Sequence, residues 1–360
     1  MTLLLLVLGL LLLVVGAEAL VRGASNLAAA VGISPLVIGL TVVAYGTSTP
    51  EMVVSVMSGL AGEADIALGN VIGSNIFNVL FILGISALLV PLVVSQQLVR
   101  LDVPLMIAVS ILILLFGIDG KIGRVDGIFL FAGVITYTVC LIHQSRKESQ
   151  DIQDEYAKAY EGQKAAALPS WTINTVLIVG GLGLLVLGSR WLVHSAVAIA
   201  QWFGISELVI GLTIVAAGTS LPEVATSIIA SIRGERDIAV GNVVGSNIFN
   251  LLAVLGLSSI IAPDGISVPT AVQRFDIPVM IAVAVACLPI FFTGHIITRW
   301  EGALFLVYYI AYALYLVLAA AQHAALPMFS MAMVWFVIPL TVLTLMVVTL
   351  RAIRTSNYER

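Results

Sequence analysis

Two nearly identical segments of this chain, which begin 172 positions apart, are each set within a long apolar stretch. The first reads IGLTVVAYGTSTPE, from Ile38 to Glu51, and the second reads IGLTIVAAGTSLPE, from Ile210 to Glu223. Each copy brings a glutamate, hydroxyls and a proline into apolar surroundings. A carboxylate at the centre of a membrane helix costs roughly 2.5 to 3.5 kcal/mol on insertion scales. Because the chain carries this cost twice, at matching positions, the pattern indicates a cation site.

The composition excludes a water-soluble globule. Hydrophobic residues make up 60% of the 360 residues and charged residues only 10%, and the mean hydropathy is +1.12. These values are typical of an integral membrane protein, which is embedded in the lipid bilayer. With about 20 apolar residues needed for each crossing, the sequence predicts about eleven transmembrane helices. They lie near residues 3–20, 34–60, 66–90, 103–118, 126–143, 173–193, 206–232, 238–262, 276–293, 301–320 and 329–350.

The basic residues predict the orientation of the chain. An excess of lysine and arginine marks the cytoplasmic side of a membrane protein. In the predicted arrangement, 12 of the 16 lysines and arginines fall on the side that also carries the C-terminus. We therefore expect the N-terminus outside and the C-terminus in the cytoplasm, in a prokaryotic inner membrane. Nothing in the sequence indicates a cofactor or a nucleic-acid partner.

The duplication extends well beyond the first motif. Residues 38–91 align without gaps to residues 210–263, and 31 of the 54 positions are identical. Each half is predicted to hold five helices. Because five is odd, the second half must enter the membrane from the opposite side, which gives inverted repeats of the kind found in many secondary transporters.

The two predicted repeats divide the chain into four parts. The first repeat covers residues 1–143, and a polar cytoplasmic linker covers residues 144–170. The second repeat covers residues 171–320. Residues 321–360 form an extra transmembrane helix and a cytoplasmic tail, and this helix has no partner in the first half. It would serve as an accessory packing element or as a contact in a homo-oligomer.

The first repeated motif supplies oxygen ligands at a broken helix. Proline has no backbone N–H, so Pro50 leaves the carbonyl of Gly46 without its usual helical partner, and Pro222 does the same to Gly218. Such carbonyls are tolerated in a membrane only where protein or a polar cavity satisfies them. Carbonyl, hydroxyl and carboxylate oxygens together suit hard cations such as calcium. The four histidines stand alone and the two cysteines lack ligand spacing, which disfavours zinc and copper.

The second repeated element is GNVIGSNIFN at Gly69 to Asn78, which returns as GNVVGSNIFN at Gly241 to Asn250. On a helix, its asparagines and serine recur every four residues and share one face. For Ser74, Asn78, Ser246 and Asn250 we favour ion coordination. For Asn70 and Asn242, interhelical hydrogen bonding remains an open alternative. A structural pairing of either glutamate with an arginine is disfavoured because no basic residue lies at a similar depth.

Other charges in the predicted spans receive structural roles. Glu18 and Arg22 are one helical turn apart and are expected to pair near the membrane surface. Asp102 and Asp276 begin predicted spans, where a carboxylate suits a helix N-terminus.

The duplicated GTSxPE and GSNIFN blocks resemble the two alpha-repeats of the sodium/calcium exchangers, within the calcium/cation antiporter superfamily. The resemblance implies an antiporter, not an enzyme, with four cation sites clustered at the membrane midplane. Carried over to this sequence, it implies backbone carbonyl ligands from Ala44 and Thr47. The site residues implied by the resemblance are Ala44, Thr47, Ser48, Glu51, Ser74 and Asn78 from the first repeat, and Ala216, Thr219, Ser220, Glu223, Ser246 and Asn250 from the second.

Two features depart from that family pattern. Many exchangers carry an aspartate where this chain has Asn250, so both copies here end in asparagine. This change bears on ion stoichiometry, on potassium dependence and on competition by protons. The eleventh predicted span also exceeds the usual ten.

Exchange follows from the charge of the predicted site. Two ionised glutamates are neutralised by one calcium ion or by several sodium ions, so the two cations exclude each other. An empty, doubly charged site would cross the bilayer at high cost, which couples one ion to the other by alternating access. Calcium/proton exchange is the principal alternative.

Two other classes of protein are disfavoured. A passive channel could use similar ligands, but a duplicated chain fits alternating access better. An intramembrane hydrolase is disfavoured because Pro50 stands where GxSxG needs glycine, because no histidine lies near, and because HExxH is absent.

Overall fold

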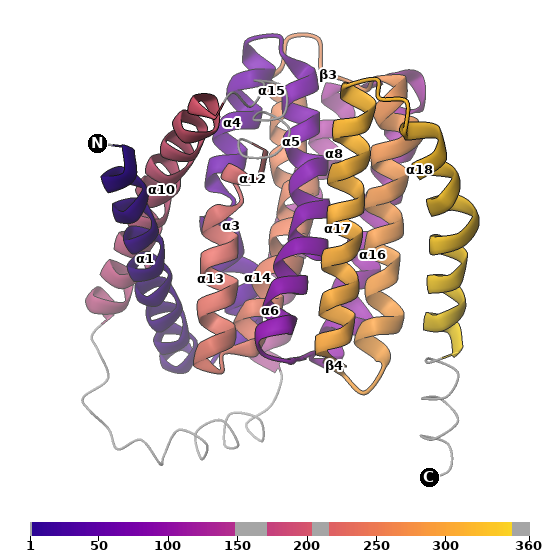
Figure 1. Cartoon of the computed structure of the whole chain (residues 1–360). Helices are drawn as coiled ribbons and strands as arrows, with labels where there is room; N and C mark the ends of the chain where they lie inside the picture. The colour runs from indigo at the N-terminus through magenta and orange to yellow at the C-terminus, as the bar shows by residue number, and fades with distance from the viewer. Residues whose placement is uncertain (1, 148–170, 204–215, 348–360) are drawn as a thin grey trace.

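The computed structural model describes residues 2–147, 171–203 and 216–347. Helices dominate it, and most of them run in parallel or antiparallel directions in one bundle (Figure 1). In the first half the helices are α1 (Thr2–Val31), α2 (Pro35–Ile38), α3 (Ala44–Thr47), α4 (Thr49–Leu60), α5 (Ala64–Phe77), α6 (Gly84–Leu89), α7 (Val103–Phe116) and α8 (Arg124–Lys147). In the remainder they are α10 (Trp171–Trp202), α12 (Ala216–Gly218), α13 (Leu221–Arg233), α14 (Arg236–Phe249), α15 (Leu255–Ile261), α16 (Ile277–Phe292), α17 (Arg299–Ala320) and α18 (Leu326–Ala332).

Several of these helices are joined end to end by π-helical segments, so that one membrane span carries two or three names. These segments are η1 (Gly39–Val43), η2 (Asn78–Leu83), η3 (Leu98–Asp102), η6 (Asn250–Val254), η7 (Val272–Asp276) and η8 (Met333–Val337). A short 3-10 turn, η4 (Gly117–Asp119), ends α7. Both η2 and η6 begin at the last asparagine of the second repeated motif.

The described ranges contain nine helices long and apolar enough to cross a membrane, or ten if the bent pair Pro35–Thr47 and Thr49–Leu60 counts as one span. The prediction of an all-helical polytopic membrane protein is confirmed. One of the eleven predicted spans, 206–232, falls partly on residues outside the described ranges and is not among these helices. Most of the predicted linker, 144–170, and the predicted cytoplasmic tail lie outside them too.

The repeated proline motif breaks its helix in both halves, as the sequence predicts. Ser48 leaves helical geometry, with φ −84° and ψ 8°, and Pro50 then opens α4. Ser220 does the same, with φ −87° and ψ 9°, ahead of Pro222 in α13. The bend at the first break is 46°. From the two breaks, α4 and α13 extend toward opposite ends of the molecule (Figure 1).

Helices α1 and α10 hold corresponding positions in the two repeats and pack against each other along one side of the bundle (Figure 1). A Cβ on Gly16 would lie 2.8 Å from the carbonyl oxygen of Gly181, and a Cβ on Gly9 would lie 2.9 Å from that of Gly188. Small residues let membrane helices approach this closely. As residue numbers rise along α1, those of its neighbours on α10 fall, so the two helices run antiparallel.

Two very short strand pairs, which the sequence analysis did not predict, join the halves. Strand β1 (Leu92–Val93) pairs with β4 (Ile296–Ile297), and β2 (Lys121–Ile122) pairs with β3 (Ile266–Ser267), both antiparallel. Each pair therefore combines one strand from each half of the sequence. The labels of β4 and β3 lie at opposite ends of the bundle in Figure 1.

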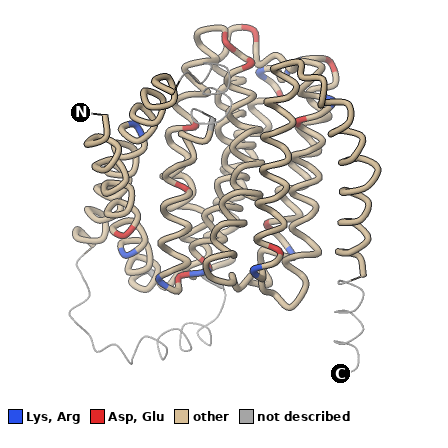
Figure 2. Tube along the Cα trace, in the orientation of Figure 1, with Lys and Arg blue, Asp and Glu red and all other residues tan. Residues whose placement is uncertain are grey.

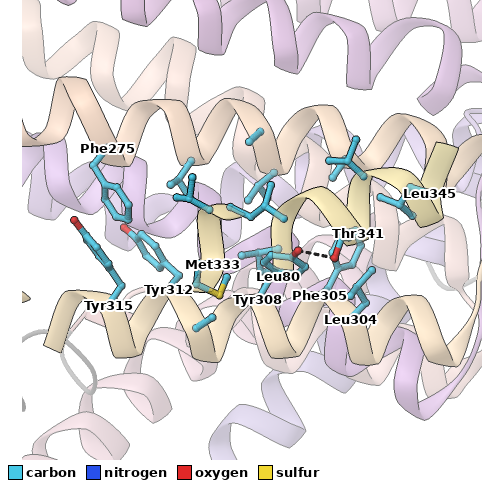
Figure 3. A pocket seen from close by; sticks show the side chains of 18 of the residues that line it. Leu80, Phe275, Leu304, Phe305, Tyr308, Tyr312, Tyr315, Met333, Thr341 and Leu345 are labelled. Carbon is cyan, nitrogen blue, oxygen red and sulfur yellow. Dashed lines mark hydrogen bonds between the residues drawn. The ribbon is translucent and has the colours of Figure 1, made fainter. Parts of the chain in front are cut away.

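The helices that carry the second repeated motif form the centre of the bundle. In the most apolar window of the span Arg236–Ile261 every residue is buried, whereas in the span Leu326–Val347 none is. An apolar cavity of about 280 Å³ separates this last span from α16 and α17. Across it, the Tyr308 hydroxyl bonds to Thr341 at 2.7 Å (Figure 3). The span Leu326–Val347 thus lies at the periphery of the bundle.

The charged residues outside the centre behave partly as predicted. Arg22 donates to Glu18 at 3.3 Å, which confirms the expected pair, and Arg233 of α13 also reaches Glu18, at 2.7 Å. Asp102 has a structural role, as expected, but its side chain does not cap α7. Its carboxylate accepts hydrogen bonds from the Tyr137 hydroxyl at 2.9 Å and from Gln97 at 3.2 Å.

The reason is that the chain already runs helically through η3 into α7, so the N–H groups after Asp102 need no side-chain cap. Asp276 repeats this arrangement in the second half, where it accepts from the Tyr312 hydroxyl at 2.9 Å and does not cap α16.

Candidate cation-binding site

The two helix breaks face each other in the interior, between α5 and α14. Both glutamates of the repeated motif are fully buried, as are the serines three residues before them: Ser48, Glu51, Ser220 and Glu223 all have 0% exposure. In Figure 2, acidic residues lie within the bundle on the segments around α3, α12 and α13, away from the basic residues near the ends. No ion pair within the described ranges involves either glutamate. The alternative of a structural arginine partner therefore finds no support there.

Each carboxylate is held by a hydroxyl from the other repeat. Ser48 donates to Glu223 Oε1 at 2.8 Å, and Ser220 donates to Glu51 Oε1 at 2.9 Å. The Ser220 hydroxyl is also 3.2 Å from that of Ser74. Since the bonds cross between the repeats, neither half builds this constellation by itself.

Four oxygens of the predicted site are buried and have no hydrogen-bond partner among the described residues. They are Glu51 Oε2, Glu223 Oε2, Asn78 Oδ1 and Asn250 Oδ1. Buried polar atoms in folded proteins are nearly always partnered, and each exception calls for an explanation such as an unseen ion. Two carboxylate and two amide oxygens make a donor set suited to a hard cation.

Asn70 and Asn242 support the broken helices, which favours the packing alternative for these two residues. The Asn70 amide donates to the carbonyl of Glu51 at 3.1 Å and to Ser55 at 2.9 Å. Asn242 does the same to the carbonyl of Glu223 at 3.4 Å and to Ser227 at 2.9 Å. Their side chains thereby position the backbone next to each carboxylate.

The side chains of Thr47 and Thr219 extend this support across the repeats. Thr47 donates to the Asn242 oxygen at 3.1 Å, and the half-buried Thr219 donates to the Asn70 oxygen at 3.3 Å. Both side chains therefore serve the interhelical contact. For Thr47, the ligand that the resemblance implies is the backbone carbonyl and not this side chain.

The remaining predicted residues lie around the same centre. Ser246 is buried and contacts the carbonyl of Ala44 at 3.5 Å. Asn78 and Asn250 are buried one helical turn beyond Ser74 and Ser246, where α5 and α14 end. Ala216 is the first residue of α12, the short helix just before the second break.

Sequence reasoning missed Asn75 and Asn247, the middle asparagines of the GSNIFN blocks. Both are 2% exposed. Asn78 donates to the side-chain oxygen of Asn247 at 3.0 Å. The signal was available, because these residues recur in both copies and adjoin the serines already singled out.

The chain matches the family model described as sodium/calcium exchanger protein over residues 1–144 and 173–318. It is 42% identical to the putative antiporter CaxA of Alkalimonas amylolytica, over 80% of this chain and 90% of that protein. It is 41% identical to the inner membrane protein YrbG of Escherichia coli, over 78% of this chain and 86% of that protein.

A solved structure of the sodium-calcium exchanger NCX_Mj superposes with a TM-score of 0.72 and 32% identity, over 86% of this chain and 96% of that one. The family match covers most of the chain, and the two relatives and the superposition agree with it. This chain therefore belongs to the sodium/calcium exchanger family and is an integral membrane cation antiporter.

Proposed function

We propose that this protein exchanges calcium for sodium across the membrane by alternating access. The site is formed by the twelve residues of the two repeated motifs: Ala44, Thr47, Ser48, Glu51, Ser74, Asn78, Ala216, Thr219, Ser220, Glu223, Ser246 and Asn250. The observation that carries this proposal is the set of buried oxygens without partners, two from each repeat. An ion bound among them would complete the coordination that the protein itself leaves open.

The choice of ions rests on charge and on ligand type. Two ionised glutamates carry a charge of −2, which one calcium ion balances and which several sodium ions can share. The nearby ligands are hydroxyl, amide and carbonyl oxygens, the types that calcium accepts in flexible geometry. Since both ions need the same two carboxylates, binding of one excludes the other.

The arrangement of the chain supports alternating access between two inverted repeats. In this proposal residues 1–143 and 171–320 each form a five-helix repeat, residues 144–170 link them, and residues 321–360 add a further helix and a tail. The antiparallel contact of α1 with α10 supports the inversion, as do the strand pairs at opposite ends. A site at the centre of such repeats can face either side of the membrane in turn.

The distribution of basic residues supports the proposed orientation, with the N-terminus outside and the C-terminus in the cytoplasm. Lys and Arg are more numerous at the lower end of the bundle in Figure 2, which would be the cytoplasmic end. The resemblance to a protein described as an inner membrane protein supports placing this chain in a prokaryotic inner membrane.

The test is calcium-45 uptake into proteoliposomes loaded with sodium, compared with choline-loaded vesicles and with vesicles under an imposed proton gradient. Glu51→Gln and Glu223→Gln are measured alongside, and Glu63→Gln, which neutralises an exposed carboxylate at the start of α5, is the matched control. Uptake that depends on sodium, survives in Glu63→Gln and disappears in both other variants is the expected result.

Other outcomes would replace parts of the proposal. Uptake driven by protons alone would make the protein a calcium/proton antiporter. Flux that continues without any counter-ion would make it a channel. Normal uptake in either site variant would remove that glutamate from the site.

A further inference from the structure

We propose that Asn247 is a positioning residue that fixes the orientation of the Asn78 amide, so that the carbonyl oxygen of Asn78, and not its NH₂ group, faces the transported cations. Among the described residues no equivalent restraint acts on Asn250, the counterpart of Asn78 in the second repeat, so its amide can turn. This inference rests on the proposed function, because it assumes that Asn78 is an ion ligand.

The orientation follows from a directional series of hydrogen bonds. The Asn247 Nδ2 group donates to the backbone carbonyl of Asn75 at 3.2 Å and lies 3.6 Å from the sulfur of Met106. Both acceptors engage the nitrogen end of Asn247. Its oxygen end is therefore the one presented to Asn78, and it accepts from Asn78 Nδ2 at 3.0 Å.

The consequence for Asn78 is chemical. The two ends of an asparagine amide have nearly the same shape but opposite hydrogen-bonding character. Because Asn78 must use its nitrogen to reach Asn247, its Oδ1 is the end left over, and this atom is buried without a partner. Turned the other way, the same side chain would present N–H groups to a cation and repel it.

The symmetry-related pair, Asn75 of the first repeat and Asn250 of the second, does not form this series. Asn75, which aligns with Asn247, donates to the carbonyl of Val71 in its own helix at 2.6 Å. Within the described part of the chain, the Asn75 oxygen has no hydrogen-bond partner, and neither end of the Asn250 amide has one. The two amides at the end of the repeated motif therefore differ, since one is held in the binding orientation and the other must be ordered when an ion arrives.

This difference predicts where ion affinity originates. A ligand already held in its bound orientation loses little freedom on binding, so residues that hold it contribute to affinity. Removal of the Asn247 amide should weaken ion binding and leave the transport step nearly unchanged. Removal of the Asn75 amide should leave both ion binding and the transport step nearly unchanged.

The experiment compares Asn247→Leu with its matched control Asn75→Leu. Leucine resembles asparagine in size but offers neither a donor nor an acceptor, and Asn75→Leu keeps the backbone carbonyl that Asn247 uses. Calcium binding to purified protein is measured by titration calorimetry, and calcium-45 uptake gives KM and maximal rate. We expect Asn247→Leu to raise Kd and KM at least tenfold with a maximal rate within twofold of the parent, and Asn75→Leu to change Kd and KM less than twofold.

Asn247→Asp tests the same idea if the leucine variant fails to fold. Its carboxylate still accepts from Asn78, so it should keep Kd within threefold of the parent or tighten it. Equal effects of the two leucine variants would overturn the inference, as would an Asn247→Leu effect on the maximal rate alone or a tenfold weaker Kd in Asn247→Asp. Absence of calcium binding in the parent protein would instead contradict the proposed function.

Discussion

The two copies of the repeated motif agree closely around the glutamates and diverge at the asparagines. Ser48 reaches Glu223 at 2.8 Å, and Ser220 reaches Glu51 at 2.9 Å. At the other end of the motif, Asn78 is hydrogen-bonded to Asn247, whereas Asn250 has no hydrogen-bond partner among the described residues. Both carboxylates are therefore placed by contacts between the repeats, but only one of the two amides is.

Substitution of the glutamates should have the largest effect on calcium uptake, and the effect should be the same for both residues. Removal of one partner from a buried, desolvated charge pair costs about 2 to 5 kcal/mol, so we expect Glu51→Gln and Glu223→Gln each to lower calcium uptake at subsaturating calcium by roughly a hundredfold or more. Uptake in proteoliposomes measures this. A tenfold difference between the two variants would break the equivalence of the two copies.

The glycine contacts between α1 and α10 should show the same symmetry in stability. A Cβ at Gly16 or at Gly188 would meet backbone atoms within 2.9 Å, and backbone cannot move aside. Overpacking of this kind costs about 1 to 3 kcal/mol, so Gly16→Leu and Gly188→Leu should lower the melting temperature in detergent to similar extents. Gly183→Leu is the control, because a Cβ there has no neighbour among the described atoms within 4 Å. Loss of stability in the control alone would contradict the packing.

Substitution of Ser48 and of Ser220 should have a smaller effect, on the KM for calcium, and this effect should differ between the two copies. A hydrogen bond to a charged group contributes about 1.5 to 3 kcal/mol, so Ser48→Ala should raise KM for calcium roughly tenfold. Ser220→Ala should raise it further, since Ser220 also contacts Ser74. Steady-state uptake over a range of calcium concentrations gives both values. A weaker effect in Ser220→Ala than in Ser48→Ala would show that this second contact contributes nothing.

The smallest effect on stability should come from an ion pair that has no counterpart in the symmetry-related position. Arg233 pairs with Glu18, but the residues aligned with them are Ala61 and Arg190, which cannot pair. Because the arginine is 57% exposed, Arg233→Gln should cost less than about 1 kcal/mol. Melting at low and at high salt measures this, and the small difference from the parent should vanish at high salt. A loss that persists at high salt would indicate a role beyond the ion pair.

Much of this architecture could be predicted from residue types. Pro50 and Pro222 remove backbone donors, and the helices do break there. The carboxylates are too costly in a membrane to be incidental, and they do lie buried at the centre. The number of predicted spans followed from apolar length, and the described helices agree with it as far as they extend.

The contacts across the interface could not be predicted in the same way. Spacing along one helix places Ser48 near Glu51, but the Ser48 hydroxyl serves Glu223, 175 positions away. Asn247 was missed because its role depends on Asn78, 169 positions away. Asp102 was assigned to a helix start because the sequence does not reveal that η3 continues helically into α7. Each of these depends on how separate helices meet, which local periodicity does not encode.

Each strand pair joins one strand from each half, and the serine–glutamate contacts run in both directions between the halves. These contacts have a consequence for how such a molecule could have arisen. None of them depends on the peptide connection between the halves, and every one joins an element of one half to the other. This is the contact pattern of an antiparallel homodimer of half-length chains. In the proposed inverted arrangement, half-length chains would have to insert in both orientations in equal amounts, whereas a single polypeptide provides one copy in each orientation. Two copies within one polypeptide can also differ from each other, as the environments of Asn78 and Asn250 do.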